Sequence, residues 1–464
     1  MVVFREENSV VIELGSYTTR ALRDITDINT RPSVQVRTRA GVLKPEETEK
    51  TEANNKPEEA DEGVVADTTA PEDESAKKDN DDNVSTNESN TEKKVDDSAN
   101  GDSEAQEPSY VFGSALESAE PGTLESVADI MSDGFVTDWE ALSAFLRYIL
   151  KELGIRIAEN YSPILFAIPP TWSKTDQECL VQIAFEHLNA PGVVISEQPL
   201  LTVFGNGAVS GLVVDIGHTT TAVSAVIDSC IVPSCVVQSP VAGQMLTDHL
   251  RSLLLADKGF VAQFDDPSQV TVEFVSALKE SGLCKLELSS TAADDTDDDG
   301  DADGDASGNT SATFEYADKK YVIPKAILHT APELLIHPPS TYTPLSSIVK
   351  QVILSCEADK RVQLWENINV VGGSSQIAGL KEYLQFELES TVLATSNIFA
   401  TSQAREVKFA SLPDYFSGWR NCDHLATFVG ACIAAKYTLN DSKHNVTRAE
   451  YNERGPGIVH RKEP

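Results

Sequence analysis

The sequence predicts an α/β protein that folds into more than one lobe. Three observations predict this class: predicted strands and helices alternate, one strand–turn motif occurs twice, and 464 residues exceed what a single core usually holds. With 41% hydrophobic residues, the chain has ample material for packed cores.

Short apolar runs bounded by turn residues predict the strands. They cover residues 9–14, 163–168, 212–215, 222–227 and 369–371. Apolar side chains three and four positions apart predict a helix over residues 139–153, with Thr137 or Asp138 as its N-cap. Ser173 precedes a second predicted helix, and a third follows Gly372 and Gly373. Strands and helices therefore follow one another as in an α/β fold.

The chain is strongly acidic, with a net charge of -36 from 37 basic and 73 acidic residues. Much of this charge lies in two polar tracts, residues 46–108 and 289–312, which hold too few apolar residues to offset the entropy of ordering. We expect both to be disordered insertions. One interpretation is tolerated loop expansion, and the alternative is binding to the basic tails of histones. Because DNA binding depends on a basic surface, we expect no strong direct DNA binding.

The cysteines indicate a reducing compartment. The chain has seven, without Cys-x-x-Cys spacing, and we expect buried thiols, with a Cys230–Cys235 pair as the alternative. The first ten residues are charged where a secretory signal is apolar, and no apolar run reaches membrane-spanning length. We therefore expect a soluble intracellular protein with no membrane partner.

The most informative feature is an internal repeat. Residues 10–19 parallel residues 212–221: each has an apolar strand, an acid, a spacer, a glycine and a run of hydroxyl residues. A tight hairpin of this kind turns backbone N–H groups and hydroxyls toward one point, which suits phosphate oxygens. The acid at the end of the strand suits a water-mediated contact to Mg²⁺.

A third motif places Gly372, Gly373 and Ser374 between a predicted strand and a predicted helix. Two glycines allow the backbone to approach a base or sugar closely, and the helix would point its N-terminus at an anion. Each motif alone is weak, because such turns are common. Their combination predicts one phosphate-binding cleft, and it is not a P-loop, because no Gly-x-x-x-x-Gly-Lys occurs.

With these motifs the sequence resembles the actin family over nearly all of its patterned length. Residues 450–462 resemble the actin C-terminus, and residues 185–191 resemble the segment that leads to actin's catalytic glutamine, here Gln198. Residues 134–139 and 278–284 also match. The resemblance implies an actin/Hsp70/hexokinase-like ATPase fold, with two similar lobes, each a mixed sheet with flanking helices, and a nucleotide cleft between them. Its lobes would be residues 1–209 and 210–408, with residues 409–464 returning to the first.

The resemblance also implies a set of site residues. ATP with Mg²⁺ would be the cofactor, and Gln198 would be the residual water-positioning residue. No side chain is expected to ligate the metal directly. The residues that would hold the nucleotide are Glu13, Gly15, Ser16, Arg20, Asp215, Gly217, Thr221, Lys279, Glu280, Gly372, Gly373 and Ser374.

Four positions depart from the actin pattern. Glu13 replaces an aspartate, Tyr17 a glycine of the phosphate turn, His218 a metal-orienting aspartate, and Ala222 the histidine that helps to place the attacking water. Losing one such contact typically reduces a rate by about 10²–10³, so we expect no efficient ATPase. Two alternatives stay open: nucleotide bound as a structural wedge, or no nucleotide. His218 is interpreted as a turn residue bonded to nearby threonines, with a metal or acid–base role as the alternative.

The likeness within the family is to nuclear actin-related subunits of SWI/SNF- and RSC-type chromatin remodellers. It implies a scaffold for transcription regulation, bound to the motor subunit's helicase-SANT-associated helix and to a second actin-related protein. The alternatives are a slow nucleotide-switched ATPase, or a subunit of histone acetyltransferase and INO-eighty-type complexes. The insertion at 46–108 falls at actin's DNase-binding loop, so we expect no filament. The partner groove would be walled by Phe204, Ile433, Tyr437 and Leu439, with ordinary core packing as the alternative.

Overall fold

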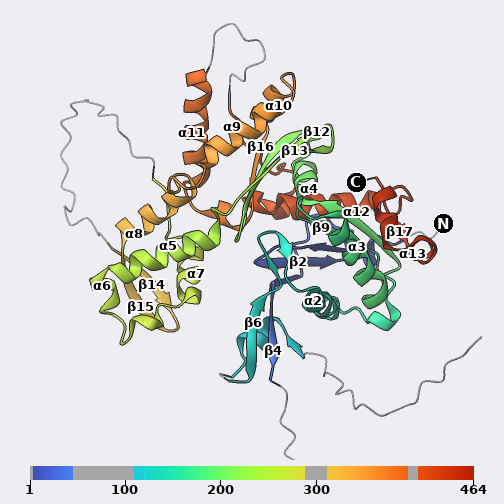
Figure 1. The fold of residues 1–464 in the computed structure, drawn as a ribbon, viewed down its shortest axis with the longest axis horizontal. Helices are drawn as coiled ribbons and strands as arrows, with labels where there is room; N and C mark the ends of the chain where they lie inside the picture. The colour runs from blue at the N-terminus through green and yellow to red at the C-terminus, as the bar shows by residue number, and fades with distance from the viewer. Residues whose placement is uncertain (1–3, 45–108, 121, 288–310, 396–405, 464) are drawn as a thin grey trace, which may run out of the picture. The chain divides into compact units, whose positions relative to one another are not determined.

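The computed structural model describes residues 4–44, 109–120, 122–287, 311–395 and 406–463 (Figure 1). The predicted insertion at 46–108 lies outside these residues, as does most of the one at 289–312. The last two residues of the second tract were wrongly assigned to it, because Ser311 and Ala312 begin a strand. Alternate side chains of that strand pack on a core, which orders it.

A six-stranded mixed sheet forms the first lobe. Its strand order is β17-β10-β9-β1-β2-β3, with β1 parallel to β9 and antiparallel to β2. Val10 and Ile12 of β1 pack into one hydrophobic core, and Val11 between them packs into another. Because successive residues of a strand face opposite sides, both faces of the sheet are covered. The strands are β1 (Val10–Glu13), β2 (Thr18–Arg23), β3 (Val34–Arg37), β9 (Ile164–Ile168), β10 (Gly192–Glu197) and β17 (Val446–Thr447).

Two helices cover one face of this sheet. Helix α2 (Trp139–Glu152) begins where the Asp138 carboxylate accepts two backbone N–H groups, so Asp138 is the N-cap. Helix α3 (Lys174–Gln182) begins with a capping box between Ser173 and Asp176 and continues into a π-helical segment, Ile183–His187. Both predicted helices are therefore present, and the local caps explain where they begin.

A four-stranded mixed sheet, in the order β13-β12-β11-β16, forms the second lobe. β11 is antiparallel to β12 and parallel to β16, which repeats the pairing of β1 with β2 and β9. The strands are β11 (Gly211–Ile216), β12 (Thr221–Ile227), β13 (Cys230–Ser239) and β16 (Ile368–Val371). The longer helices that share its core are α5 (Gly243–Ala256), α7 (Val272–Glu280), α9 (Leu345–Ser355) and α11 (Leu380–Thr395). The predicted fold class, two similar α/β lobes, is confirmed.

A third core joins the two sheets. Val11 of β1 and Val213 of β11 belong to the same buried cluster, together with the helices α4 (Gln198–Gly205) and α12 (Ala426–Thr438). In Figure 1, α12 runs beside α4 and the strands of the first sheet. The two helices cross at glycines: a methyl group on Gly430 would overlap the Leu201 carbonyl, and one on Gly205 the Ala426 carbonyl. Small residues at this crossing allow the backbones to touch.

The C-terminal segment ties the second sheet to the first. Phe409 and Ala410 still lie beside Ile368 of β16, so the chain leaves the second sheet after Ala410 rather than at residue 409. It then forms α12, strand β17, which pairs with β10, and α13 (Arg448–Arg454). The sheets are therefore connected by covalent chain and by packing.

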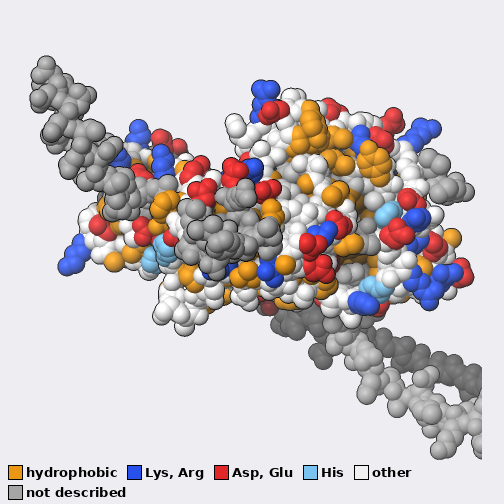
Figure 2. All heavy atoms as spheres, turned by 90° about the horizontal axis from the view of Figure 1, so that it is seen from above, with side chains coloured by type: hydrophobic (Ala, Val, Ile, Leu, Met, Phe, Trp, Pro, Cys, Tyr) orange, Lys and Arg blue, Asp and Glu red, His pale blue; other side chains and the backbone are white. Residues whose placement is uncertain are grey.

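Smaller elements complete the described part of the chain. Its other strands are β4 (Arg39–Leu43), β5 (Tyr110–Val111), β6 (Leu124–Asp129), β7 (Met131–Ser132), β8 (Phe135–Val136), β14 (Ser311–Tyr316) and β15 (Lys319–Pro324). Its other α-helices are α1 (Gly113–Glu117), α6 (Lys258–Val261), α8 (Lys325–Thr330) and α10 (Arg361–Trp365). None of the helices described is long and apolar enough to cross a bilayer. Figure 2 shows red and blue side chains interspersed on one face, so neither sign of charge dominates that face.

The cysteines are all free thiols. Most are buried, but Cys230 is exposed, because it sits at the turn into β13, and the prediction of a core thiol was wrong there. The alternative pairing with Cys235 does not occur. Cys235 lies instead beside Cys356, with 3.3 Å between the two sulfur atoms.

The glycine crossing yields a stability test. Gly430→Ala should lower the free energy of unfolding by about 2 kcal/mol, because the added methyl group pushes α12 away from the α4 backbone. Urea unfolding followed by circular dichroism measures it. The control is Gly457→Ala, where the new methyl group would meet only the Glu178 carboxylate at 3.5 Å. Equal stabilities of the two variants would contradict a tight crossing.

Candidate functional site

One large cavity, of about 620 Å³, lies where the two repeated hairpins meet. The turn after β1 and the turn after β11 are in direct contact, since the Thr219 hydroxyl donates to Ser16 Oγ over 3.2 Å. With one exception, the predicted nucleotide residues and Gln198 line this cavity. They are Glu13, Gly15, Ser16, Arg20, Gln198, Asp215, Gly217, Lys279, Glu280, Gly372, Gly373 and Ser374.

Thr221 is the exception, and its assignment to the site was wrong. Its hydroxyl donates to the Val241 carbonyl at 2.7 Å, and its side chain is buried away from the cavity. Thr220 and Ala222 line the cavity instead. Successive residues of a strand face opposite sides of the sheet. From the sequence alone, it was therefore predictable that Thr220 and Thr221 would not both face the cavity.

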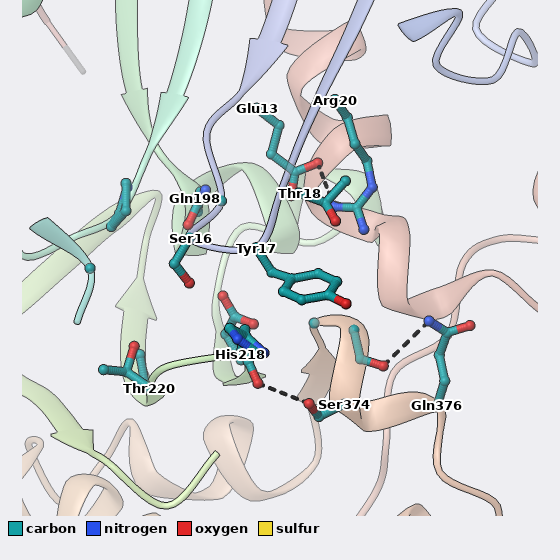
Figure 3. Close-up of a pocket in the computed structure, with 18 of the residues that line it drawn as sticks. Glu13, Ser16, Tyr17, Thr18, Arg20, Gln198, His218, Thr220, Ser374 and Gln376 are labelled. Atoms are coloured by element: carbon teal, nitrogen blue, oxygen red, sulfur yellow. Dashed lines mark hydrogen bonds and ion pairs between the residues drawn. The ribbon is translucent and has the colours of Figure 1, made fainter. Parts of the chain in front are cut away.

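Glu13 and Arg20 form an ion pair at the floor of the first hairpin. They are partners across the β1–β2 ladder, and Arg20 Nη1 lies 3.4 Å from Glu13 Oε2 (Figure 3). Arg20 Nε is buried and has no hydrogen-bond partner among the described residues. The Arg20 side chain lines the cavity, and its positive charge suits an anionic ligand, whereas the unpaired Nε itself is buried.

Asp215 is the penultimate residue of β11 and adds a second carboxylate near Glu13. Burial and, less strongly, the charge of Glu13 together raise the pKa of Asp215 to about 6, against the opposing effect of Arg20. A carboxylate whose ionised form is this unfavourable would gain from a nearby cation. Glu13 and Asp215 thus suit the water-mediated Mg²⁺ contact that an adenine nucleotide would bring. Among the described residues, no group of three or more His, Cys, Asp or Glu is arranged to hold a metal by itself.

The glycine turn after β16 closes the cavity from a third side. Gly372 has φ 90°, and a Cβ there would meet the Asp215 carboxylate and the Ile216 carbonyl, so only glycine fits. Ser374 Oγ donates to the Gly217 carbonyl over 2.9 Å and fixes the turn to the second hairpin. The helix predicted to follow directly is a short 3-10 turn, Gly373–Gln376, and α11 begins only at Leu380. The predicted α-helix N-terminus is therefore not at this turn.

Lys279 and Gln198 line the cavity, but their side chains already donate hydrogen bonds to other groups of the protein. The Lys279 ammonium donates to the Gly243 carbonyl at 3.0 Å and to Thr247 Oγ1 at 2.9 Å, both on α5. Gln198 Nε2 donates to the Leu14 carbonyl at 2.7 Å. Gln198 thus keeps its amide oxygen and one amide hydrogen for a water molecule, and Ala222, which also lines the cavity, has no polar side-chain atom.

Two aromatic side chains occupy the space between the hairpins. The ring of Tyr17 packs on the ring of His218 with 4.3 Å between centroids (Figure 3). Burial lowers the pKa of His218 to about 4, helped by the charges of Lys279 and Arg37, so the imidazole is neutral at physiological pH. The predicted bonds from His218 to nearby threonines are replaced by this ring contact. A sequence reading could not see it, because the partners are 201 positions apart in the chain.

The predicted partner groove is only partly present at the surface. Leu439 is 0% exposed, so its assignment as a groove wall was wrong: the residue caps α12 and turns into the third core. Phe204 and Ile433 pack on the same core and are partly buried. Tyr437 is 73% exposed on α12. Of the four residues, Tyr437 is therefore the one freely accessible to another molecule.

Two similar α/β lobes, with repeated hairpins that meet at one cavity, define a protein of the actin, Hsp70 and hexokinase class. The family model described as Actin matches residues 4–464. The chain belongs to the actin family.

Individual relatives agree with this assignment. The chain is 29% identical to mouse "Actin-like protein 9", over 71% of this chain and 72% of the relative. It is 26% identical to the Schizosaccharomyces pombe "SWI/SNF and RSC complexes subunit arp9", with both chains covered completely. It is 27% identical to Arabidopsis thaliana "Actin-related protein 7", over 78% of this chain and 89% of the relative.

Asp215 gives the site a pH-dependent signature. Its pKa in the folded protein, about 6, lies above the ordinary value of 3.8, so its favourable contribution to folding is complete below about pH 4 and is lost as the pH rises through 6. Asp215→Asn should therefore raise the free energy of unfolding at pH 7.5 by about 2 kcal/mol and give no gain at pH 4. Thermal unfolding in Mg²⁺-free buffer at both pH values measures this.

The matched control for Asp215 is Asp228→Asn. Asp228 is exposed, and its hydrogen bond and ion pair with Lys360 lower its pKa, so its removal should not stabilise the protein at pH 7.5. A stabilising effect of Asp215→Asn that is equal at pH 4 and pH 7.5 would contradict the raised pKa.

Proposed function

We propose that this chain is a non-catalytic scaffold subunit of a nuclear chromatin-remodelling complex of the SWI/SNF or RSC type, in the actin-related protein nine class. Support comes from the fission yeast relative, which is named as a subunit of these complexes and aligns over the full length of both chains. The actin-related protein four class, found in acetyltransferase and INO-eighty-type complexes, is the less favoured alternative, because full-length coverage is with the SWI/SNF and RSC subunit.

The observation that carries the non-catalytic proposal is the content of the cavity between the hairpins. Tyr17 and His218 line the cavity and pack on each other between the two hairpins, and Ala222 provides no side-chain group to position an attacking water. Positioned polar groups aimed at the reacting atoms supply most of an enzyme's rate enhancement. A cavity with apolar or aromatic groups in place of such polar groups is better suited to a structural role than to ATP hydrolysis.

A slow, nucleotide-switched ATPase is the second candidate. Gln198, Asp215 and the positively charged Arg20 still line the cavity. These groups fit ATP with Mg²⁺ at its polar end. Mg²⁺-dependent turnover that disappears in Gln198→Ala would favour this candidate over the scaffold, and no measurable turnover in the unmodified chain would favour the scaffold.

We further propose that the α12 surface around Tyr437 receives the motor subunit's helicase-SANT-associated helix, with a second actin-related protein alongside. Tyr437 exposes 73% of its surface, and partly buried Phe204 and Ile433 extend the apolar area toward α4. Tyrosine supplies large contact area and one hydrogen bond, which suits the anchor of a helix interface. Binding of histones by the acidic tracts stays a further proposal, and those tracts lie outside the described residues.

Substitution of Tyr437 tests the partner surface. Tyr437→Asp should reduce recovery of the motor subunit in affinity purification by at least about tenfold, because it places a charge in an apolar contact. The melting temperature should stay unchanged, since the side chain is mostly in solvent. Phe204→Asp is not a suitable variant, because Phe204 packs on the third core.

The matched control is Tyr161→Asp, at a tyrosine that is 76% exposed in the segment before β9. It should leave recovery of the motor subunit unchanged. Normal recovery by Tyr437→Asp would overturn the proposed surface. Purification of the unmodified chain without any remodeller subunit would overturn the proposed function itself.

A further inference from the structure

Tyr17 crosses the cleft from one lobe to the other. It lies in the turn between β1 and β2, and its hydroxyl donates to Glu280 Oε1 over 3.2 Å, at the end of α7. Its ring also rests on His218, in the turn of the opposite hairpin (Figure 3). One side chain of the first lobe therefore contacts two separate elements of the second.

The first lobe holds this side chain in position. The guanidinium carbon of Arg37, at the end of β3, lies 3.6 Å from the centre of the Tyr17 ring, which is the geometry of a cation–π contact. The Thr38 N–H donates to the Tyr17 carbonyl at 2.9 Å and fixes the backbone of the turn. Because both the ring and the backbone are held, Tyr17 reaches across the cleft as an ordered group.

The second lobe provides a complementary surface for it. His218 offers a neutral ring, and Glu280 offers a carboxylate that accepts the phenolic proton. Burial raises the pKa of Tyr17, and the charge of Glu280 adds to this, so the phenol stays protonated and remains a donor. Ring and hydroxyl are thus both satisfied by the lobe opposite.

Further contacts cross the cleft beside Tyr17. Thr219 Oγ1 donates to Ser16 Oγ and accepts the Asp133 N–H, each over 3.2 Å. Turns that direct backbone N–H groups and hydroxyls toward one point suit phosphate oxygens, and a phosphate between these two turns would contact both. Here side chains of the protein already join the hairpins, and the Glu280 carboxylate beside them repels negative charge.

We propose that Tyr17 is an intramolecular latch that takes the place of the terminal phosphates of a nucleoside triphosphate. It occupies the space between the hairpins and connects the lobes through His218 and Glu280. A triphosphate enters only after Tyr17 leaves these contacts, so the cleft is held closed by the protein itself. This inference concerns the isolated chain and is independent of which complex it joins.

Two variants of Tyr17 separate occupancy of the space from connection of the lobes. Tyr17→Ala removes the ring, so binding of Mg²⁺–ATP to the full chain, measured by titration calorimetry, should become at least about tenfold tighter. Tyr17→Phe keeps the ring and removes only the bond to Glu280. Its affinity for Mg²⁺–ATP should lie between those of the unmodified chain and Tyr17→Ala, because the ring leaves the cleft more easily without this bond. Circular dichroism verifies that both variants are folded.

Hydrogen exchange without nucleotide measures the connection. Amides of the two hairpin turns and of the end of α7 should exchange at least about threefold faster in Tyr17→Phe, and faster still in Tyr17→Ala, because local opening becomes easier. Equal Mg²⁺–ATP affinity of the unmodified chain and Tyr17→Ala would overturn the replacement of phosphates. Unchanged exchange in Tyr17→Phe would overturn the connection through Glu280. Neither result depends on a partner, so both are distinguishable from failure of the proposed scaffold role.

Discussion

The contact between α4 and α12 sets the geometry on which the cleft depends. The two helices lie in the core that also buries Val11 of β1 and Val213 of β11, so they fix the distance between the strands that lead into the two hairpins. Gly205 and Gly430 bring the helix backbones together. Because the turns after β1 and β11 follow directly from these strands, their meeting at Ser16 and Thr219 is a consequence of packing some way below the cavity.

Inside the cavity, most of the charged groups are satisfied by the protein. Arg20 is paired with Glu13 and Lys279 is bonded to α5, while Arg37, which does not line the cavity, lies on the Tyr17 ring. For Asp215, burial and Glu13 disfavour the ionised carboxylate, and the charge of Arg20 offsets this only in part. When the cationic side chains of a cleft are already paired with groups of the protein, their attraction for a highly charged anionic ligand is weakened. This arrangement agrees with a structural role for the two lobes better than with a cycle of binding, hydrolysis and release.

The sequence predicted the fold and the meeting point of the hairpins because both follow from local patterns. A repeated strand, acid and glycine defines where each strand ends, and equivalent ends converge in a duplicated fold. Two of the wrong assignments concern the direction of single side chains, which packing decides: Thr221 faces the core instead of the cavity, and Leu439 turns inward at the end of α12. Crowding by Tyr17 was predictable from its position in the turn. Its bond to Glu280 was not, because the two residues are 263 positions apart.

The glycine crossing also has a mechanical consequence. Tyr437 and Gly430 belong to the same helix, and Gly430 touches the backbone of α4 without an intervening side chain. Flexible side chains normally absorb small displacements between helices, and at Gly205 and Gly430 none lies between the two backbones. A force applied to the exposed end of α12 would therefore be transmitted through this backbone contact to α4, and through the shared core to both sheets. We expect the α4–α12 pair to resist deformation under such a force.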